Sequence, residues 1–426
     1  MIVYVTKPGD SIYSIARLYG INPETIIADN ELANPDRLVV GQTLVLMTDT
    51  IAHIVRRGES LFSLARAYRV SLEQIKDANP QITNPYMLSI GQVINIPVPT
   101  NKYGTIYVNG YAFPNIDQDV LTKTLPYLTY LSIFSYQVRP DGSLSMINDT
   151  PLIEKARNAG VAPMMVITNI EEGASFSSDL AHTILTNQEV QQKLIKNIIN
   201  KLDTKNYFGL DIDFEYIYPE DGEDYDRFLR IITSQLSSLG YIVTTALAPK
   251  TSATQRGLLY EAHHYPVHGW LVNHVILMTY EWGYTFGPPL AVAPINEVRK
   301  VLDYAVTAIP SEKILMGMPN YGYDWTLPFR QGSAARSLSL TGAVNVALRE
   351  NAAISYDQKS QAPYFYYNDA AGVGHVVWFD DARSIQARLR LVDIYDLGGV
   401  SYWTINQFFP QNWLILKSMY DIRKVL

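Results

Sequence analysis

Cysteine is absent from the 426-residue sequence. Without it the protein has no disulfide bond, no thiolate zinc site and no cysteine nucleophile. Long apolar runs are also missing, since nowhere do about 18 apolar residues follow one another, as a transmembrane helix requires. The first residues, MIVYVTKPGD, contain neither the basic segment nor the apolar segment of a secretion signal. We therefore expect no membrane span and no signal peptide.

Positive charge is scarce as well. Lysine and arginine number 34 against 41 acidic residues, a net charge of -7 without any basic run, which argues against nucleic-acid binding. With 47% hydrophobic and 18% charged residues, the composition is that of a globular protein. The chain exceeds what one small core supports, so we expect two or more domains. Thirty tyrosines and six tryptophans suit either a surface that stacks on sugar rings or a large aromatic core.

Two copies of one module open the chain. Residues 4–30 align without a gap on residues 53–79, and after a one-residue insertion GQTLVL (41–46) matches GQVINI (91–96). Such internal repetition is decisive for the fold. With only two copies, we expect two compact modules rather than a solenoid.

Each module predicts the order strand, helix, helix, strand. In the first copy, Asp10 and Ser11 offer oxygen atoms that can cap a helix, and Gly20 provides its stop. A second helix is expected to begin at Asn22, because Pro23 then falls at the first helical position, where proline is tolerated.

This repeat resembles the lysin motif (LysM), a module that binds glycans containing N-acetylglucosamine, such as peptidoglycan and chitin. The GD or GE turn, the ARLY or ARAY run and the NP…GQ tail carry the resemblance, over modules that we place at 1–48 and 51–98. It implies a sugar groove beside the loop after the first strand, flanked by Gly9, Asp10, Gly58 and Glu59. The alternative is that these residues are only caps and turns of a small fold. Two modules in tandem would raise the affinity for a polymer.

The segment IPVPTNKYG (96–104) reads as a linker, after which strand-like and helical stretches alternate. Strands are expected near 104–111, 127–136, 162–169, 207–215, 242–248, 274–281, 314–319 and 399–405. Eight such units predict an α/β fold, a (β/α)8 TIM barrel over 103–426, with its active site at the carboxyl ends of the strands. The long seventh connection, about 322–380, predicts a small α+β insertion.

The fourth predicted strand, GLDIDFE (209–215), carries three acids at alternate positions. Strand geometry places Asp211, Asp213 and Glu215 on one face, pointing into the barrel, while the apolar residues between them pack outward. Acids about 6.6 Å apart in a buried strand repel each other and lose hydration, so one of them should hold a proton at neutral pH. A carboxylic acid kept neutral in this way is suited to protonate a leaving oxygen.

Other interpretations of these polar residues are open at this point. The acids could face water at a solvated strand end, or could bind Mg²⁺ or Ca²⁺, which prefer oxygen ligands. His263, His264 and His268 raise the question of zinc. Because Pro266 lies inside the i, i+4 pair and spoils helical geometry, we expect these histidines to belong to a loop.

At GLDIDFE the sequence resembles the DxxDxDxE signature of family 18 glycoside hydrolases, the chitinase-like barrels. Three further segments agree with that family in order: LMTYEW (277–282), PNYGYDW (319–325) and GGVSYWTIN (398–406). The resemblance covers residues 103–426. Two positions depart from the family pattern, since Phe208 stands where the first aspartate of the signature belongs and Glu281 replaces the usual aspartate after the tyrosine.

The resemblance implies substrate-assisted retaining catalysis, in which the N-acetyl oxygen of the sugar is the nucleophile. It implies that Glu215 is the acid and base, that Asp213 orients the acetamido group with Asp211 behind it, and that Tyr280 donates to the acetamido oxygen. Trp403 would lie beneath the sugar, although a tryptophan that ends an inward strand is often only packing. Weaker sugar contacts are expected at Tyr111, Glu281, Asn320 and Tyr321. The mechanism requires no metal and no cofactor.

Lysin motifs on such a barrel resemble the bacterial spore cortex-lytic enzymes of the SleL/YaaH type. This implies an N-acetylglucosaminidase that cleaves spore peptidoglycan in germination and lies in the coat or cortex region of the spore. An extracellular or wall-associated location is the alternative. The expected partner is peptidoglycan or another N-acetylglucosamine polymer, bound by a monomer, with no nucleic acid or membrane. A chitinase and an inactive glycan-binding coat protein stay open as other functions.

Overall fold

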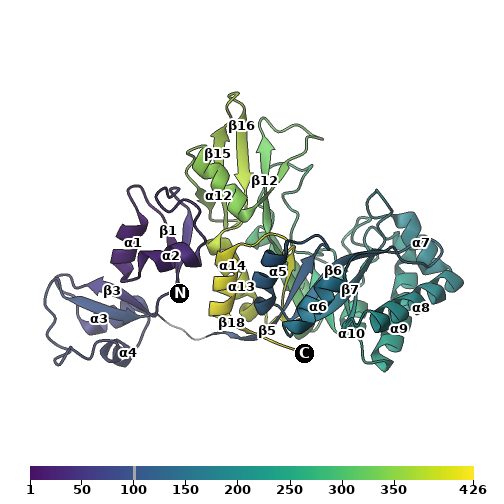
Figure 1. The fold of residues 1–426 in the computed structure, drawn as a ribbon, viewed down its shortest axis with the longest axis horizontal. Helices are drawn as coiled ribbons and strands as arrows, with labels where there is room; N and C mark the ends of the chain where they lie inside the picture. The colour runs from purple at the N-terminus through teal and green to yellow at the C-terminus, as the bar shows by residue number, and fades with distance from the viewer. Residues whose placement is uncertain (99–101) are drawn as a thin grey trace.

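The computed structural model describes residues 1–98 and 102–426 (Figure 1). Two small modules lie beside a barrel, and an inserted sheet stands above it. The predicted linker, 96–104, falls partly on 99–101, which lie outside the described residues.

Each N-terminal module is a two-stranded antiparallel sheet with two short helices. Module 1 contains β1 (Ile2–Val5), α1 (Ile12–Tyr19), α2 (Pro23–Asp29) and β2 (Thr43–Leu46). Module 2 contains β3 (Thr50–Ile54), α3 (Leu61–Tyr68), α4 (Leu72–Asp77) and β4 (Val93–Pro97). The predicted element order is confirmed in both.

Three of the predicted helix caps of module 1 form at Ser11, Gly20 and Asn22, whereas Asp10 accepts from Tyr4 and Lys7 and does not cap α1. The Ser11 side chain accepts from the backbone N–H of Ser14, and Gly20 ends α1 in the left-handed conformation, with φ of 66°. Asn22 caps α2, and Pro23 is its first residue. In module 2 the residue that aligns with Gly20 is Arg69, which adopts φ of 55°.

The two modules differ in how they are packed. Val39 and Val45 of module 1 belong to the same buried apolar cluster as the barrel. The Thr43 hydroxyl donates to Oε1 of Gln411 at 2.8 Å, and Nε2 of Gln411 donates to the Thr43 carbonyl at 2.7 Å. The buried residues of module 2 form a separate cluster around Ile75. Each module therefore has a core of its own, around Ile15 in module 1 and Ile75 in module 2, and module 1 is in addition built into the main body.

Eight parallel strands close into a barrel, because β17 pairs with both β11 and β5. The strands are β5 (Gly104–Ala112), β6 (Tyr130–Gln137), β7 (Ala162–Thr168), β8 (Gly209–Asp213), β9 (Ile242–Leu247), β10 (His274–Leu277), β11 (Ile314–Pro319) and β17 (Gly399–Trp403). A short ninth strand, β18 (Tyr420–Ile422), pairs with the start of β5. The predicted (β/α)8 barrel is confirmed, and the first five residues of GLDIDFE form its fourth strand, which ends at Asp213 and so before Glu215.

Helices surround the barrel and bury one face each against it. In α9, for example, Tyr225, Phe228, Leu229, Ile232 and Leu236 are buried at helical spacing. The α-helices are α5 (Gln118–Thr124), α6 (Thr150–Asn158), α7 (Ser178–Thr186), α8 (Gln188–Thr204), α9 (Gly222–Ser238), α10 (Tyr265–Leu271), α11 (Ile295–Ala308), α13 (Ala382–Ile394) and α14 (Pro410–Met419). Short 3-10 helices are η1 (Leu125–Tyr127), η2 (Pro219–Asp221) and η3 (Ser311–Lys313).

The connection after β11 forms a five-stranded antiparallel sheet of order β13-β12-β16-β15-β14, with one helix. Its elements are β12 (Tyr321–Thr326), β13 (Arg336–Ser339), α12 (Leu340–Arg349), β14 (Ser355–Asp357), β15 (Ala362–Asn368) and β16 (Gly374–Trp378). The insertion follows the carboxyl end of β11, so it stands at the barrel rim where an active site is expected.

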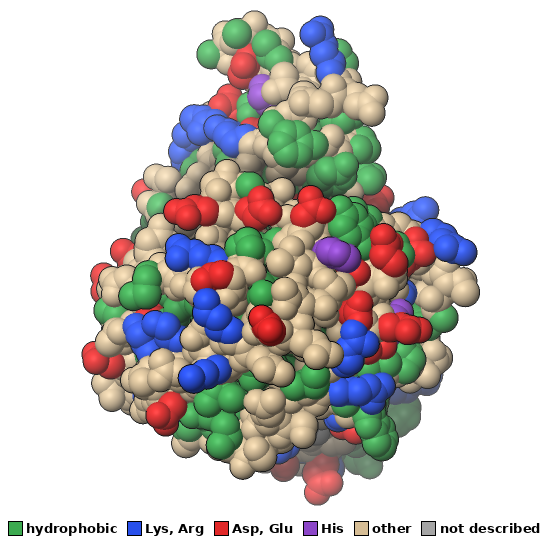
Figure 2. All heavy atoms as spheres, turned by 90° about the vertical axis from the view of Figure 1, so that its right-hand side faces the viewer, with side chains coloured by type: hydrophobic (Ala, Val, Ile, Leu, Met, Phe, Trp, Pro, Cys, Tyr) green, Lys and Arg blue, Asp and Glu red, His purple; other side chains and the backbone are tan. Residues whose placement is uncertain are grey.

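The face over α7, α8 and α9 carries acidic and basic side chains interspersed (Figure 2). Among the described residues, no helix combines the length and the apolar character that crossing a membrane requires.

Candidate active site

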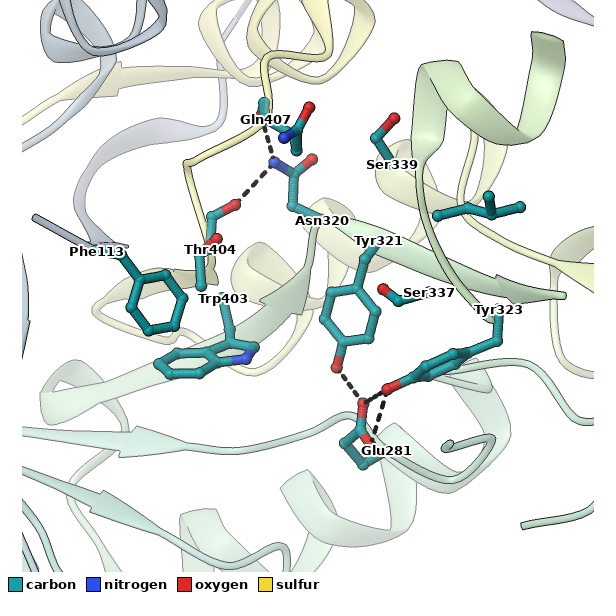
Figure 3. Close-up of a pocket in the computed structure, with 11 residues that line it drawn as sticks. Phe113, Glu281, Asn320, Tyr321, Tyr323, Ser337, Ser339, Trp403, Thr404 and Gln407 are labelled. Atoms are coloured by element: carbon teal, nitrogen blue, oxygen red, sulfur yellow. Dashed lines mark hydrogen bonds between the residues drawn. The ribbon is translucent and has the colours of Figure 1, made fainter. Parts of the chain in front are cut away.

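A cavity of about 550 Å³ opens at the carboxyl ends of β11 and β17, beneath the insertion. Its volume lies in the range of ligand pockets. It is lined by Phe113, Glu281, Asn320, Tyr321, Tyr323, Ser337, Leu338, Ser339, Trp403, Thr404 and Gln407, drawn in Figure 3. The carboxyl ends of four barrel strands (β5, β10, β11 and β17) and the insertion thus contribute to its walls.

Asp211 lies fully buried inside the barrel and accepts two hydrogen bonds. The Tyr111 hydroxyl donates to one carboxylate oxygen and the Thr244 hydroxyl to the other, both at 2.6 Å. Burial raises the pKa of Asp211 to about 6, against the opposing effect of the two hydroxyls. Tyr111 is itself buried and does not line the cavity, so its hydroxyl serves Asp211.

Asp213, the next inward acid, is 5% exposed. In the part of the chain that the structure describes, its Oδ1 is buried without a hydrogen-bond partner. Burial raises the pKa of Asp213 well above its usual value, and the neighbouring charges of Glu215 and Asp211 raise it further. Because an unpaired buried oxygen is costly, this carboxyl group is available to a donor that enters the site.

Glu215 lies two residues beyond the end of β8. Its backbone N–H donates to Oδ1 of Asn169 at 2.9 Å, and the Asn169 amide donates back to its carbonyl at 2.8 Å. Burial first, and the charge of Glu281 second, raise the pKa of Glu215 to about 7. Sequence reasoning missed Asn169, although it directly follows β7, the neighbouring strand.

Tyr280 reaches the same acids from the sixth strand. The strand predicted over 274–281 ends earlier, at Leu277, and Tyr280 lies in the segment that follows it. Burial and the charges of Asp213 and Glu215 raise the pKa of the Tyr280 hydroxyl, so it stays protonated and can donate. Gly317 makes room for the ring, because a Cβ there would lie 2.8 Å from Cε1 of Tyr280.

Glu281 adopts φ of 68° and turns its carboxylate toward the insertion. Its Oε1 accepts from the Tyr321 hydroxyl and, at 3.1 Å, from the Tyr323 hydroxyl (Figure 3). Loss of hydration raises the pKa of Glu281, while the two tyrosines oppose that rise. The glutamate that departs from the family pattern therefore links the sixth strand to the inserted sheet.

Trp403 is half-buried at the end of β17, within an aromatic group. Its ring centroid lies 4.8 Å from Phe134, 5.3 Å from Tyr111 and 5.9 Å from Phe113. Phe113 and Trp403 both border the cavity (Figure 3). Phe113 and Phe134 were not predicted, because each is a single aromatic residue whose place depends on barrel closure.

Asn320 borders the cavity, yet its amide is occupied by the backbone. Nδ2 donates to the carbonyls of Thr404 at 2.9 Å and Gln407 at 2.7 Å (Figure 3). Both N–H donors therefore hold the loop that follows β17, and only the side-chain oxygen is left for a ligand.

Phe208, the other departure from the family pattern, lies at the amino end of the barrel interior. It packs with Tyr130 and Tyr107 in a small apolar cluster, and its ring centroid is 6.3 Å from that of Tyr130. An aspartate there would lose hydration in these surroundings. Asp211 is held by its hydroxyl donors without help from this position.

The prediction that the histidines belong to a loop is wrong for His268, which lies in α10. Pro266 stands in the first turn of that helix, where its missing N–H costs nothing. His263 accepts from the N–H of Ala248 at 3.0 Å and donates to the Phe214 carbonyl at 3.0 Å. Burial lowers its pKa to about 4. Both nitrogens are thus engaged within the protein, and the described residues hold no group of three or more metal-ligating side chains.

The four predicted module residues lie in turns. Gly9 and Gly58 have φ of 86° and 87°, which favours glycine. Oδ2 of Asp10 accepts from the Tyr4 hydroxyl and from the N–H of Lys7, both at 2.7 Å. Glu59 likewise contacts His53 and accepts from the N–H of Arg56, each at 2.7 Å. These contacts fit the interpretation as structural turns.

The whole chain can be compared with known proteins. Residues 104–407 match the family described as "Glycosyl hydrolases family 18", and residues 4–46 and 53–97 match the LysM domain. Over 431 residues the chain is 42% identical to the cortical fragment-lytic enzyme of Bacillus subtilis (strain 168), covering 100% of this chain and 99% of that protein.

Solved structures agree with that result. The spore cortex-lytic enzyme SleL of Bacillus megaterium QM B1551 has a TM-score of 0.92 and 40% identity, with 100% of this chain and 99% of that chain covered. SleL of Bacillus cereus has a TM-score of 0.86 and 39% identity, covering 99% and 98%. The chain therefore belongs to family 18 of the glycosyl hydrolases.

Proposed function

We propose that this protein is an N-acetylglucosaminidase that cleaves β-1,4 bonds after N-acetylglucosamine in spore-cortex peptidoglycan. The observation that carries the proposal is the pairing of two acids. Asp213 has a buried oxygen without a partner among the described residues, and Glu215 beside it has its pKa raised to about 7. A neutral acid next to a free acceptor suits a reaction in which a proton is donated while an N–H group is held.

Glu215 donates its proton to the glycosidic oxygen as the bond from that oxygen to the anomeric carbon breaks. At the same carbon a bond forms from the acetamido carbonyl oxygen of the sugar, which gives an oxazolinium ion. Asp213 accepts from the acetamido N–H and stabilises the positive charge, with Asp211 fixed behind it by Tyr111 and Thr244. Tyr280 donates to the acetamido oxygen and orients it for attack.

In the second step Glu215, now ionised, takes a proton from water. The water oxygen attacks the anomeric carbon and the acetamido oxygen leaves, so the configuration is retained and Glu215 is again protonated. Trp403 offers an apolar surface beneath the sugar, with Phe113 beside it at the cavity edge. Polar contacts to the sugar come from three other residues of the cavity wall, Glu281, Asn320 and Tyr321.

The mechanism selects the sugar in the cleaved position. A muramic lactam has no free acetamido group, so it cannot supply the nucleophile, whereas N-acetylglucosamine can. The relatives named as cortical fragment-lytic and spore cortex-lytic enzymes support the cortex as the source of the glycan. The protein then acts in the spore during germination, and its two LysM modules hold the polymer close to the barrel.

Digestion of purified cortex muropeptides, with product ends identified by mass spectrometry, tests the proposal. Wild-type protein should leave reducing N-acetylglucosamine ends, and Glu215→Gln should leave the substrate uncut. Reducing muramic ends would contradict the proposed linkage. Cleavage of chitin oligomers alone would assign a chitinase, and binding of muropeptides without cleavage would assign a glycan-binding coat protein.

A further inference from the structure

The contact between module 1 and the barrel is too specific for a flexible tether. Besides the two buried hydrogen bonds between Thr43 and Gln411, the N–H of Ile354 donates to the Val40 carbonyl at 2.8 Å. Gly41 has φ of 85°, and a Cβ on it would lie 2.0 Å from the Ile354 carbonyl oxygen. Around the corresponding Gly91 of module 2, no atom of residues 1–98 or 102–426 lies within 4 Å of such a Cβ. Module 1 is therefore held in one position, and the surface between it and the barrel has a defined shape.

A narrow groove of about 50 Å³ lies along that contact. One wall is the loop after α2, which contains the NP motif, and the other is α12 together with the start of α14. Its lining includes Glu31, Asn34, Arg37, Thr341, Asn345 and Phe409. The groove is too shallow to enclose a sugar ring, so it suits contact along one edge of a chain.

The same two chain segments line this groove and the cavity that Glu281 and Trp403 border. Residues 337–339 border the cavity, and α12, which begins at Leu340, borders the groove. On the opposite side Gln407 borders the cavity, while Phe409 and Gln411 border the groove. The cavity and the groove are thus separated by only a few residues along both segments.

The chemistry of the groove fits an acidic amino-sugar polymer. Half-buried Val344 and Leu348 offer some apolar surface to a sugar ring, and Asn345 is exposed beside them for hydroxyl and amide groups, whereas Phe409 is buried beneath the groove. Glu31, the acid in the lining, is paired with Lys123 at 2.8 Å, whereas Arg37 is exposed at the edge and forms no ion pair among the described residues. An unpaired guanidinium is suited to bind a carboxylate.

We propose that this groove is an outer binding site for the glycan whose cleavage takes place at Glu215, with Arg37 binding a carboxylate substituent carried by the chain. The inference rests on the proposed function, because it takes the same polymer as ligand. Module 1 thereby forms part of one extended cleft, and module 2 holds the polymer independently. In module 2 the positions of Asp36 and Arg37 are occupied by Tyr86 and Met87, which are exposed.

Glycan chains of graded length, prepared from cortex peptidoglycan and retaining their carboxylates, test the groove. The variant is Arg37→Met, which introduces the residue found at the matching position of module 2, so the fold should tolerate it. Arg17→Met is the matched control, since Arg17 is also exposed in module 1 but lies outside the groove. Thermal melting checks that both variants are folded.

Arg37→Met should lower kcat/KM for long chains about five- to tenfold, the effect of losing one charge-assisted hydrogen bond. It should leave the shortest cleaved chain unaffected, and Arg17→Met should equal wild type at every length. If Arg37→Met also equals wild type at every length, the groove is not a glycan site. Binding of the same chains to Glu215→Gln, measured by calorimetry, keeps the test independent of cleavage. When Arg37→Met is added to Glu215→Gln, Kd should rise for long chains only. An unchanged Kd would overturn the inference even if no chain is cleaved.

Discussion

The acids of the barrel and the acids of the modules occur in equally conspicuous motifs, yet their surroundings differ. Asp10 and Glu59 lie in turns and accept hydrogen bonds from nearby groups of their own modules. Asp213 is buried with an oxygen that has no partner in the described structure, and the pKa of Glu215 is raised to about 7. Asp10 and Glu59 stabilise their turns. Burial instead raises the pKa values of Asp213 and Glu215, which does not stabilise the fold.

The two kinds of acid have opposite effects on the stability of the folded protein. A hydrogen bond from His53 and the backbone N–H of Arg56 lower the pKa of Glu59, so its charged form favours the folded module. Burial raises the pKa of Asp213, so its charged form opposes folding. Residues that are costly to the native state and lie beside a cavity are candidates for catalysis.

The largest expected effect is that of Glu215→Gln. The amide keeps the shape of the side chain but cannot donate the proton, so kcat on muropeptides should fall about 10²- to 10⁴-fold. Initial rates measured by release of reducing ends give this value. The control, Glu59→Gln, changes the same group in a module turn and should stay within about twofold of wild type. Equal losses in the two variants would remove the distinction between the two regions.

Asp213→Asn should change activity and stability in opposite directions. Loss of the acceptor that stabilises developing charge should lower kcat about 10²- to 10³-fold. Because the folded-state pKa of Asp213 is raised, the native state binds this proton more tightly than the unfolded state does. The free energy of unfolding therefore falls as pH rises from the unfolded pKa through the folded one. The asparagine removes this loss, so Tm at pH 7 should rise.

Thermal melts of the Asp213→Asn variant between pH 4 and pH 8 provide the measurement. The gain over wild type should be absent at the acidic end and grow toward neutral pH. Glu59→Gln should show the opposite sign, because the lowered pKa of Glu59 stabilises the fold above its unfolded pKa. A Tm for Asp213→Asn that is lower than wild type at pH 7 would mean that the aspartate is satisfied in the folded protein.

A smaller effect is expected from Glu281→Gln. Its negative charge is the second cause, after burial, of the raised pKa of Glu215. Removal of that charge should lower this pKa, and the alkaline limb of the kcat profile, where Glu215 loses its proton, should move to lower pH. The pH dependence of kcat in wild type and variant measures the shift. An unmoved limb would show that Glu281 does not act on the acid.

The smallest effect on catalysis is expected from Asp10→Ala. The variant loses the acceptor for the Tyr4 hydroxyl and the Lys7 N–H, which should cost about 1 kcal/mol of stability in module 1. Activity on the shortest muropeptides should not change. Urea unfolding and initial rates, each beside Glu59→Ala in module 2, provide the comparison. A clear loss of activity on short substrates would show that Asp10 does more than brace a turn.

Much of the fold could be predicted from the periodicity of the sequence and the order of its motifs. The alternating acids of GLDIDFE set the register of β8, and the helix caps at Ser11 and Asn22 placed the module helices correctly. Local patterns of this kind act within one element, so they can be interpreted without knowing its neighbours. The eighth strand was recognised for the same reason.

The features that the sequence did not predict depend on contacts between residues that are far apart in the chain. Asn169 holds the backbone of Glu215 only because β7 and β8 are adjacent, and Gly317 matters only because the Tyr280 ring lies against it. The docking of module 1 follows the same rule, since Gly41 and its counterpart Gly91 look alike in the alignment but differ in their surroundings. His268 was misplaced because a proline early in a helix was taken as a break.

The nucleophile is the most direct point at which to test this account. Matched oligosaccharide substrates would carry acetyl, monofluoroacetyl, difluoroacetyl or trifluoroacetyl groups on the nitrogen of the cleaved sugar, and kcat/KM would be measured for each. Fluorine withdraws electrons from the carbonyl oxygen, so attack by that oxygen predicts a steep fall in rate with every fluorine added. A rate that is independent of fluorination would contradict substrate assistance and require a nucleophile from elsewhere.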